Sequence, residues 1–93
     1  MNVKRAAEIL AETFPSLGVE ADAGWGEGVI FLGSAAEGAE IDDLPAANYY
    51  GGFEDPEEKI WVLGVHKKLA EKLDELGYYA DWHDPGTLLA FEK

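Results

Sequence analysis

The sequence predicts an α+β fold in which two helix–strand–strand units form a four-stranded antiparallel sheet with both helices on one face. The first observation is that two segments with helical spacing of apolar residues each precede segments that alternate like strands. The second is an internal repeat with seven identities over the thirteen positions from 10 to 22. The third is size, since 93 residues with 47% hydrophobic content indicate a single domain, 1–93, with its own core. The repeated residues are Leu10-Ala11-Glu12 with Leu17-Gly18-x-x-Ala21-Asp22, and Leu69-Ala70-Glu71 with Leu76-Gly77-x-x-Ala80-Asp81.

The first unit begins with a helix predicted over Val3 to Phe14, which Pro15 ends. Residues 19–23 alternate small apolar residues with acids, as a half-buried strand does. Glycines at 24, 26 and 28 then favour a turn before a β-branched and aromatic strand at 29–32. Residues 33–53 are rich in Gly and Ala, so we expect a long excursion with a short strand at Asn48–Phe53.

The second helix is predicted to begin with Asp55 as N-cap and Pro56 in the first helical position, and to end at Gly77. Its apolar stripe comprises Trp61, Val65, Leu69, Leu73 and Leu76. Gly64 in mid-helix costs about 1 kcal/mol relative to Ala, which leaves open a break there with Ile60–Leu63 as a strand. The single helix is our interpretation.

A hairpin is predicted for the C-terminal part, with strands at Tyr78–His83 and Thr87–Phe91 around the turn Asp84-Pro85-Gly86. Tyr78, Ala80 and Trp82 should face the core. The opposite face of the sheet should carry Tyr79, Asp81, His83, Leu88 and Glu92, together with Glu20 and Asp22 from the first unit.

Charge and composition exclude several classes of function. The net charge is −12, from 7 basic against 19 acidic residues, and residues 6–58 hold thirteen acids without one Lys or Arg. Such a balance argues against a primary nucleic-acid binder and against docking on an anionic membrane. No cysteine is present, which excludes thiol catalysis and disulfides. Apolar runs of four residues at most, and no secretory signal, lead us to expect a soluble protein of the host cytoplasm.

Catalytic chemistry has little support in the sequence. There is no nucleophile–base pair of recognisable spacing, so we expect neither an enzyme nor a cofactor. Asp81, His83 and Asp84 contain donor atoms for a divalent metal, and a small metal-dependent hydrolase is one hypothesis. The simpler interpretation is that Asp84 opens the Asp-Pro-Gly turn with its side chain and that no metal is bound.

The acids are the main functional signal, because carboxylates interspersed with aromatic rings suit a partner rich in Lys and Arg. Charge pairing and cation–π contacts would then act together. The expected partner-binding residues are Glu20, Asp22, Trp25, Asp42, Asp43, Glu54, Asp55, Tyr79 and Asp81.

The last third of the chain resembles small proteins carried by phages. The resemblance rests on Trp61-Val-Leu-Gly-Val-His66 and on Tyr79-Ala-Asp-Trp82-His83-Asp84-Pro-Gly86-Thr87-Leu88. In size and charge the chain is also similar to anti-CRISPR and other anti-defence inhibitors. What this resemblance implies is a stoichiometric blocker of a basic nucleic-acid-binding host protein, such as a CRISPR effector subunit. It transfers no individual functional residue, because those inhibitors share no common motif.

A second hypothesis is a structural or adaptor domain whose acidity serves solubility. Its open sheet face or an edge strand would then mediate self-association, as a homodimer that buries Tyr79 and Leu88.

Overall fold

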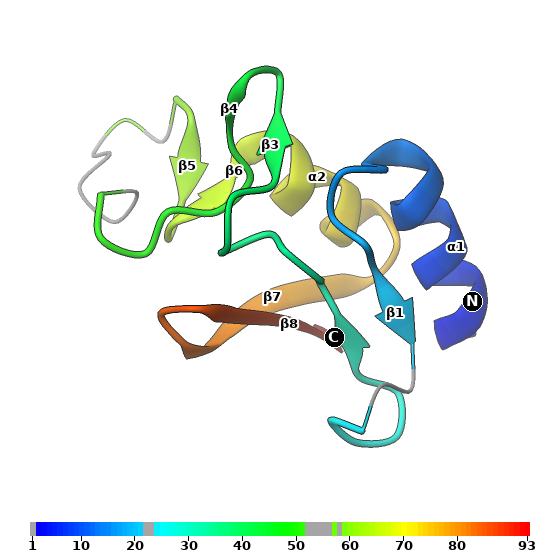
Figure 1. Cartoon of the computed structure of the whole chain (residues 1–93). Coiled ribbons are helices and arrows are strands. Elements are labelled where there is room, and N and C mark those ends of the chain that lie inside the picture. Colours follow the sequence, from blue (N-terminus) through cyan, green and yellow to red (C-terminus); the bar gives the residue numbers. More distant parts are fainter. Residues whose placement is uncertain (1, 22–23, 52–56, 58) are drawn as a thin grey trace.

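The structure, a computed structural model, describes residues 2–21, 24–51, 57 and 59–93 (Figure 1). Within these ranges the α+β class is confirmed, with two helices and a four-stranded antiparallel sheet. Two further two-stranded hairpins lie between the first and second halves of that sheet in sequence. In chain order the elements are α1 (Val3–Thr13), β1 (Glu20–Ala21), β2 (Ile30–Phe31), β3 (Glu40–Ile41), β4 (Leu44–Pro45), β5 (Trp61–Val62), β6 (Val65–His66), α2 (Lys67–Glu75), β7 (Tyr78–Asp84) and β8 (Thr87–Glu92).

The sheet has the strand order β1-β2-β8-β7, so β8 lies in the middle and β7 forms an edge. Residues opposite one another in antiparallel strands point to the same face. One row across the four strands consists of Ala21, Ile30, Ala90 and Ala80, and it faces the core. The neighbouring row consists of Glu20, Phe31, Leu89 and Asp81, and it therefore faces the other way.

The hydrophobic core draws on both helices and on the sheet. Leu10 of α1, Leu69 and Leu73 of α2, and Ile30 of β2 are almost completely buried in one cluster. The remaining members include side chains from the loops, such as Leu17. Residues of the helices, of the loops and of the inward row of the sheet therefore share one buried cluster, so we look for functional side chains on the outward side of the sheet or at its edges.

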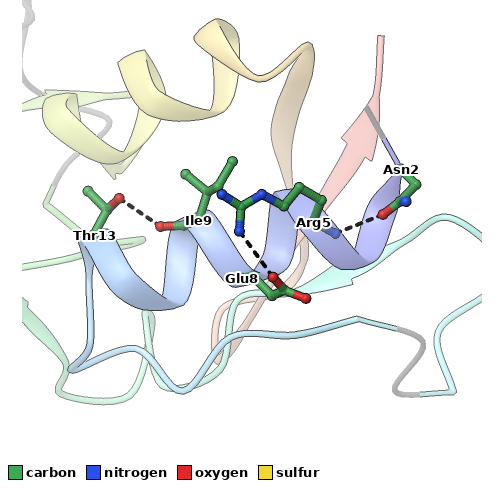
Figure 2. Close-up of polar contacts among 5 residues, drawn as sticks. All are labelled: Asn2, Arg5, Glu8, Ile9 and Thr13. Carbon is green, nitrogen blue, oxygen red and sulfur yellow. Dashed lines mark hydrogen bonds and ion pairs between the residues drawn. The ribbon is translucent and has the colours of Figure 1, made fainter.

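Helix α1 is confirmed close to its predicted bounds. The Asn2 side chain caps its start by accepting the N–H of Arg5 at 2.8 Å (Figure 2). Arg5 and Glu8 form an ion pair on the exposed side at 3.1 Å, and the Thr13 hydroxyl donates to the carbonyl of Ile9 in the last turn. The described helices, of 11 and 9 residues, are too short and too polar to cross a membrane.

The prediction of one long helix up to Leu76 is wrong. Helix α2 begins only at Lys67, capped by the buried His66, and residues 61–66 form the β5–β6 hairpin. Leu63 and Gly64 are the two central residues of its turn, with φ of +51° and +83°. A helix cannot pass through two left-handed residues, so the alternative with a break at Gly64 describes this segment better. The proposed cap residues Asp55 and Pro56 lie outside the described residues.

The long excursion folds into turns and a second small hairpin. Strands β3 and β4 pair around the turn Asp42-Asp43, where both residues have positive φ. Asn48 to Gly51 form a turn, in which the Asn48 side chain accepts the N–H of Gly51 at 2.9 Å. The predicted strand at 48–53 is therefore wrong over 48–51, and residues 52–53 lie outside the described part of the chain.

The C-terminal hairpin is confirmed, but its register corrects two face assignments. Trp82 pairs with Leu88 and Tyr78 pairs with Glu92, so Leu88 and Glu92 share the face of the core-directed strand residues. Leu88 is almost fully buried, whereas Tyr79 is exposed. The expectation that Leu88 and Glu92 lie on the open face beside Tyr79 was wrong.

Candidate functional site

The outward side of the four-stranded sheet is the candidate site, and we call it the open face. Carboxylates occupy its two outer strands and apolar side chains its middle. Glu20 on β1 and Asp81 on β7 are the ends of one cross-strand row, about 14 Å apart for three strand spacings. Its residues are Glu20, Trp25, Phe31, Tyr79, Asp81, His83, Leu89 and Phe91.

Aromatic rings gather at two places on the open face. Trp25 packs against Phe31 with ring centroids 6.1 Å apart, and meets His83 edge-on at 4.8 Å. Tyr79 stacks on Phe91 at 5.8 Å. Trp25 remains 39% exposed and Tyr79 46% exposed, so both rings offer area to a partner. Tyr79 and His83 lie four residues apart on β7, which separates the two aromatic groups by about 13 Å with Asp81 between them.

Two carboxylates of the open face form no ion pair with any described residue. All acidic residues in the described ranges are exposed, and neither Glu20 nor Asp81 forms an ion pair with a described residue. Asp81 does have one local partner, because its carboxylate accepts the backbone N–H of Trp82 at 2.9 Å. Uncompensated charge beside exposed aromatic rings is what a cationic partner would recognise.

Four of the predicted partner-binding residues therefore lie on the same open face: Glu20, Trp25, Tyr79 and Asp81. Asp42 and Asp43 do not join them, because they form the β3–β4 turn, which stands apart from the β7–β8 hairpin (Figure 1). Asp22, Glu54 and Asp55 lie outside the described residues.

Asp42 has a local structural role. It pairs with Lys68 at the start of α2, and the hydrogen bond from that ammonium lowers the pKa of the Asp42 carboxyl from its ordinary value. Its positive φ, like that of Asp43, suits the two-residue hairpin turn that it forms. We expect the main role of these two acids to be structural, in the β3–β4 turn, and not in binding a partner.

The possible metal ligands are engaged locally. The Asp84 carboxylate accepts the N–H of Gly86 at 2.9 Å, which is the predicted side-chain turn, while His83 lies against Trp25. Across the described ranges, no three His, Asp or Glu side chains are grouped so that they could hold a metal ion.

His66 is a buried titratable group at the junction of β6 and α2. It is only 5% exposed, and its Nδ1 accepts the N–H of Lys68 at 3.1 Å. Burial lowers the pKa of His66, and the charge of Asp42 opposes this shift. Its position at the helix start indicates a capping role.

Sequence reasoning also missed a groove beside the sheet edge. It has a volume of about 520 Å³ and lies between β7, α2 and the β5–β6 turn. Leu63, 69% exposed in that turn, lies on its wall. The pair Leu63-Gly64 between β-branched residues is a hairpin signal that could have revealed this arrangement.

Comparison of the chain with protein-family models, with curated proteins and with solved structures gives no match. Its function is therefore inferred from the chemistry of the described residues.

Proposed function

We propose that this protein is a non-enzymatic acidic inhibitor of the anti-CRISPR kind, which occupies a basic nucleic-acid-binding site on a host defence protein. The observation that supports it is the open face, where the carboxylates of Glu20 and Asp81 form no ion pair with a described residue and share the face with the exposed rings of Trp25 and Tyr79. A site that binds nucleic acid presents Lys and Arg to phosphates and flat groups to bases. The open face offers the complementary carboxylates and rings.

The binding step would combine two kinds of interaction. Long-range attraction between a chain of net charge −12 and a cationic groove would speed encounter. Once in contact, Lys and Arg side chains would pair with Glu20 and Asp81 and stack on Trp25 or Tyr79. Nucleic acid would be excluded because both ligands need the same cations. The partner in this proposal is a CRISPR effector subunit in the host cytoplasm.

The proposal includes a finer architecture than the sheet and helices alone. Helix α1 precedes β1 and β2, and helix α2 precedes β7 and β8. We propose that these are two helix–strand–strand units whose helices share one face of the sheet. Such an arrangement leaves the open face available to a partner.

The experiment uses purified CRISPR effector subunits that carry a fluorescent nucleic acid. The wild-type protein should displace the nucleic acid at a stoichiometry of one inhibitor per site, and less effectively as salt rises. The double variant Glu20→Gln/Asp81→Asn should be weaker by about tenfold, because two unpaired charges are lost from the face. Asn at position 81 keeps an oxygen that can accept the Trp82 N–H.

The matched control is Glu12→Gln/Glu71→Gln, which removes the same charge from exposed helix positions that form no ion pair with a described residue. It should displace nucleic acid nearly as well as wild type. Equal weakening of both double variants would assign the effect to net charge instead of the open face. Failure to displace nucleic acid from any effector would refute the proposed function.

The open face also favours a second candidate, a self-associating adaptor domain, since Phe31 and Phe91 are only partly buried there. Its interface would bury Tyr79, but Leu88 is already inside the protein's own core. Sedimentation velocity over a range of concentrations separates the two candidates. A stable homodimer that Tyr79→Glu dissociates supports the adaptor, and a monomer at all concentrations excludes it.

A further inference from the structure

The edge strand β7 has no paired strand on its outer side among the described residues. It is seven residues long and is paired with β8 on its other side. The N–H of Lys93 donates to the carbonyl of Gly77 at 3.0 Å, so Gly77 and Lys93 form a hydrogen-bonded pair next to the β7–β8 ladder. Hydrogen-bonded pairs alternate in antiparallel strands, so residues 79 and 81 bond to β8. The backbone groups of Tyr78, Ala80 and Trp82 therefore point outward from the edge.

The groove lies along this outward side. Tyr78, Ala80 and Trp82 line it from the strand, and Ala70 lines it from α2. The indole of Trp82 donates to the carbonyl of Leu63 at 3.0 Å and so joins the strand to the β5–β6 turn. A chain laid beside β7 would direct every second side chain into this largely apolar space.

Leu63 is the most unusual residue of the groove. It has a φ of +51°, a conformation that costs a leucine more than an Asn, Asp or Gly. The equivalent turn between β3 and β4 uses Asp42 and Asp43, so the fold itself shows the ordinary solution. Leu63 is also exposed and contributes little to the core. A strained residue that leaves an apolar side chain in solvent points to a function in binding.

The charge of Asp81 indicates which side chains a segment bound at the β7 edge would carry. Asp81 lies in the middle of β7 on the open face, and its carboxylate caps the outward N–H of Trp82. This local contact protects the edge against indiscriminate strand pairing. Of the other charges at the groove, Lys93 and Asp74 already pair with each other. A side chain placed next to Asp81 by an added strand would therefore meet an uncompensated negative charge.

We propose that the β7 edge and its groove receive an extended segment of the partner protein, in which apolar residues alternate with Lys or Arg. The segment adds to the sheet as a fifth strand, with apolar side chains against Leu63 and Ala80 and a basic side chain beside Asp81. A carbonyl of the added strand takes over the Trp82 N–H and frees the Asp81 carboxylate for the basic side chain. The inference rests on the proposed function for the basic character of the partner.

The test uses a labelled, end-blocked heptapeptide of alternating valine and lysine. Binding is followed by fluorescence anisotropy, and the site by amide chemical shifts of the protein. The peptide should bind and shift amides of β7. An analogue that is N-methylated along one edge, and an analogue with glutamate in place of lysine, should each bind more weakly by about tenfold or more.

Leu63→Asn is the decisive variant, because Asn tolerates positive φ. It should keep or raise the melting temperature and weaken peptide binding by about tenfold. Asp81→Asn should lower the affinity for the lysine peptide. It should also reduce the difference in affinity between the lysine peptide and the glutamate peptide. Tyr50→Asn is the control, since Tyr50 is 81% exposed and outside the groove lining, and it should bind the peptide as wild type does.

Three results would overturn the inference: no binding of the lysine peptide, unchanged affinity in Leu63→Asn, or a homodimer paired through β7. Its failure is distinguishable from failure of the proposed function. If wild type displaces nucleic acid and Leu63→Asn does so equally well, the docking inference fails alone. If the peptide binds at β7 but no effector loses its nucleic acid, the proposed function fails alone.

Discussion

Gly33 lies directly against the backbone of Leu17. The N–H of the next residue, Ser34, donates to the Leu17 carbonyl at 2.7 Å. A Cβ built on Gly33 would overlap that carbonyl oxygen and come within 2.6 Å of the Gly18 oxygen. This close approach joins the chain after β2 to the segment that follows α1, whose Leu17 side chain is fully buried in the core.

Replacing Gly33 by Ala should therefore strongly destabilise the fold. The backbone must shift to relieve the overlap, and φ of +57° adds strain, so we expect a loss of about 3 kcal/mol in the free energy of unfolding. Gly18→Ala is the control, because its φ is +71° but a Cβ there meets nothing within 4 Å. It should lose only about 1 kcal/mol. Urea denaturation compares the two, and equal losses would contradict the prediction.

His66 should make the stability fall in mildly acidic solution. Burial lowers its pKa from the ordinary 6.5, so the unfolded chain takes up a proton at a higher pH than the folded chain. The free energy of unfolding should then decrease as pH falls below about 6.5, by at most about 1.4 kcal/mol per pH unit. Above that range the imidazole is neutral in both states and contributes no pH dependence. Urea denaturation between pH 5 and about 7.5 measures the effect.

His66→Asn is the matched variant for this pH dependence. The Asn side chain still offers an acceptor for the Lys68 N–H but does not titrate. The difference in stability between wild type and variant should change across this pH range, while contributions common to both proteins cancel. Parallel stability curves would show that His66 contributes nothing to the pH dependence.

The cap of α1 should contribute measurably to stability. Asn2→Ala removes the oxygen that accepts the Arg5 N–H and should cost about 1 kcal/mol (Figure 2). Asn2→Asp keeps an acceptor and places a negative charge at a helix start that has none in its first turn. It should be as stable as wild type or slightly more so. Thermal denaturation tests both, and a loss in Asn2→Asp equal to that in Asn2→Ala would exclude the capping role.

Trp25→Ala should separate binding from folding on the open face. The ring is partly exposed and makes its described contacts with Phe31 and His83, so its removal should cost about 1–2 kcal/mol of stability. Displacement of nucleic acid from the effector should weaken by about tenfold. Trp25→Phe, which keeps an aromatic ring, should recover most of this loss. Full displacement activity in folded Trp25→Ala would remove Trp25 from the binding surface.

Local patterns were enough to predict the helix at 3–13 and the hairpin at 78–92. In each segment the apolar residues recur with a clear period, helical in the first and alternating in the second. Pro15 marks the end of the helix, and the Asp-Pro-Gly sequence marks the turn of the hairpin. Strand alternation also placed Glu20, Tyr79 and Asp81 on one face. The position of Trp25 near them does not follow from alternation, because it depends on how the glycine-rich turn folds over Phe31.

The second helix failed as a prediction because its signals suit two structures. Trp61, Val65 and Leu69 are spaced four apart, which fits a helical face, yet Val62 and Val65 are also β-branched neighbours of a two-residue turn. Tertiary contacts decide between them. The N–H of His66 bonds to Ala46 and the indole of Trp61 bonds to Pro45, and both partners are remote in sequence. The groove beside β7 was missed for the same reason, because it depends on where tertiary contacts place the β5–β6 turn.

The central position of β8 has a consequence for synthesis. Strand β8 lies between β2 and β7, so these two strands are joined in one sheet only through β8. Ala90 of β8 pairs with Ile30 of β2, and the two residues are about sixty positions apart in the sequence. A nascent chain emerging from the ribosome must hold Ile30 and its surroundings exposed until residues 87–92 have been made. Chaperone engagement and degradation of stalled or shortened products should therefore be most acute in that interval.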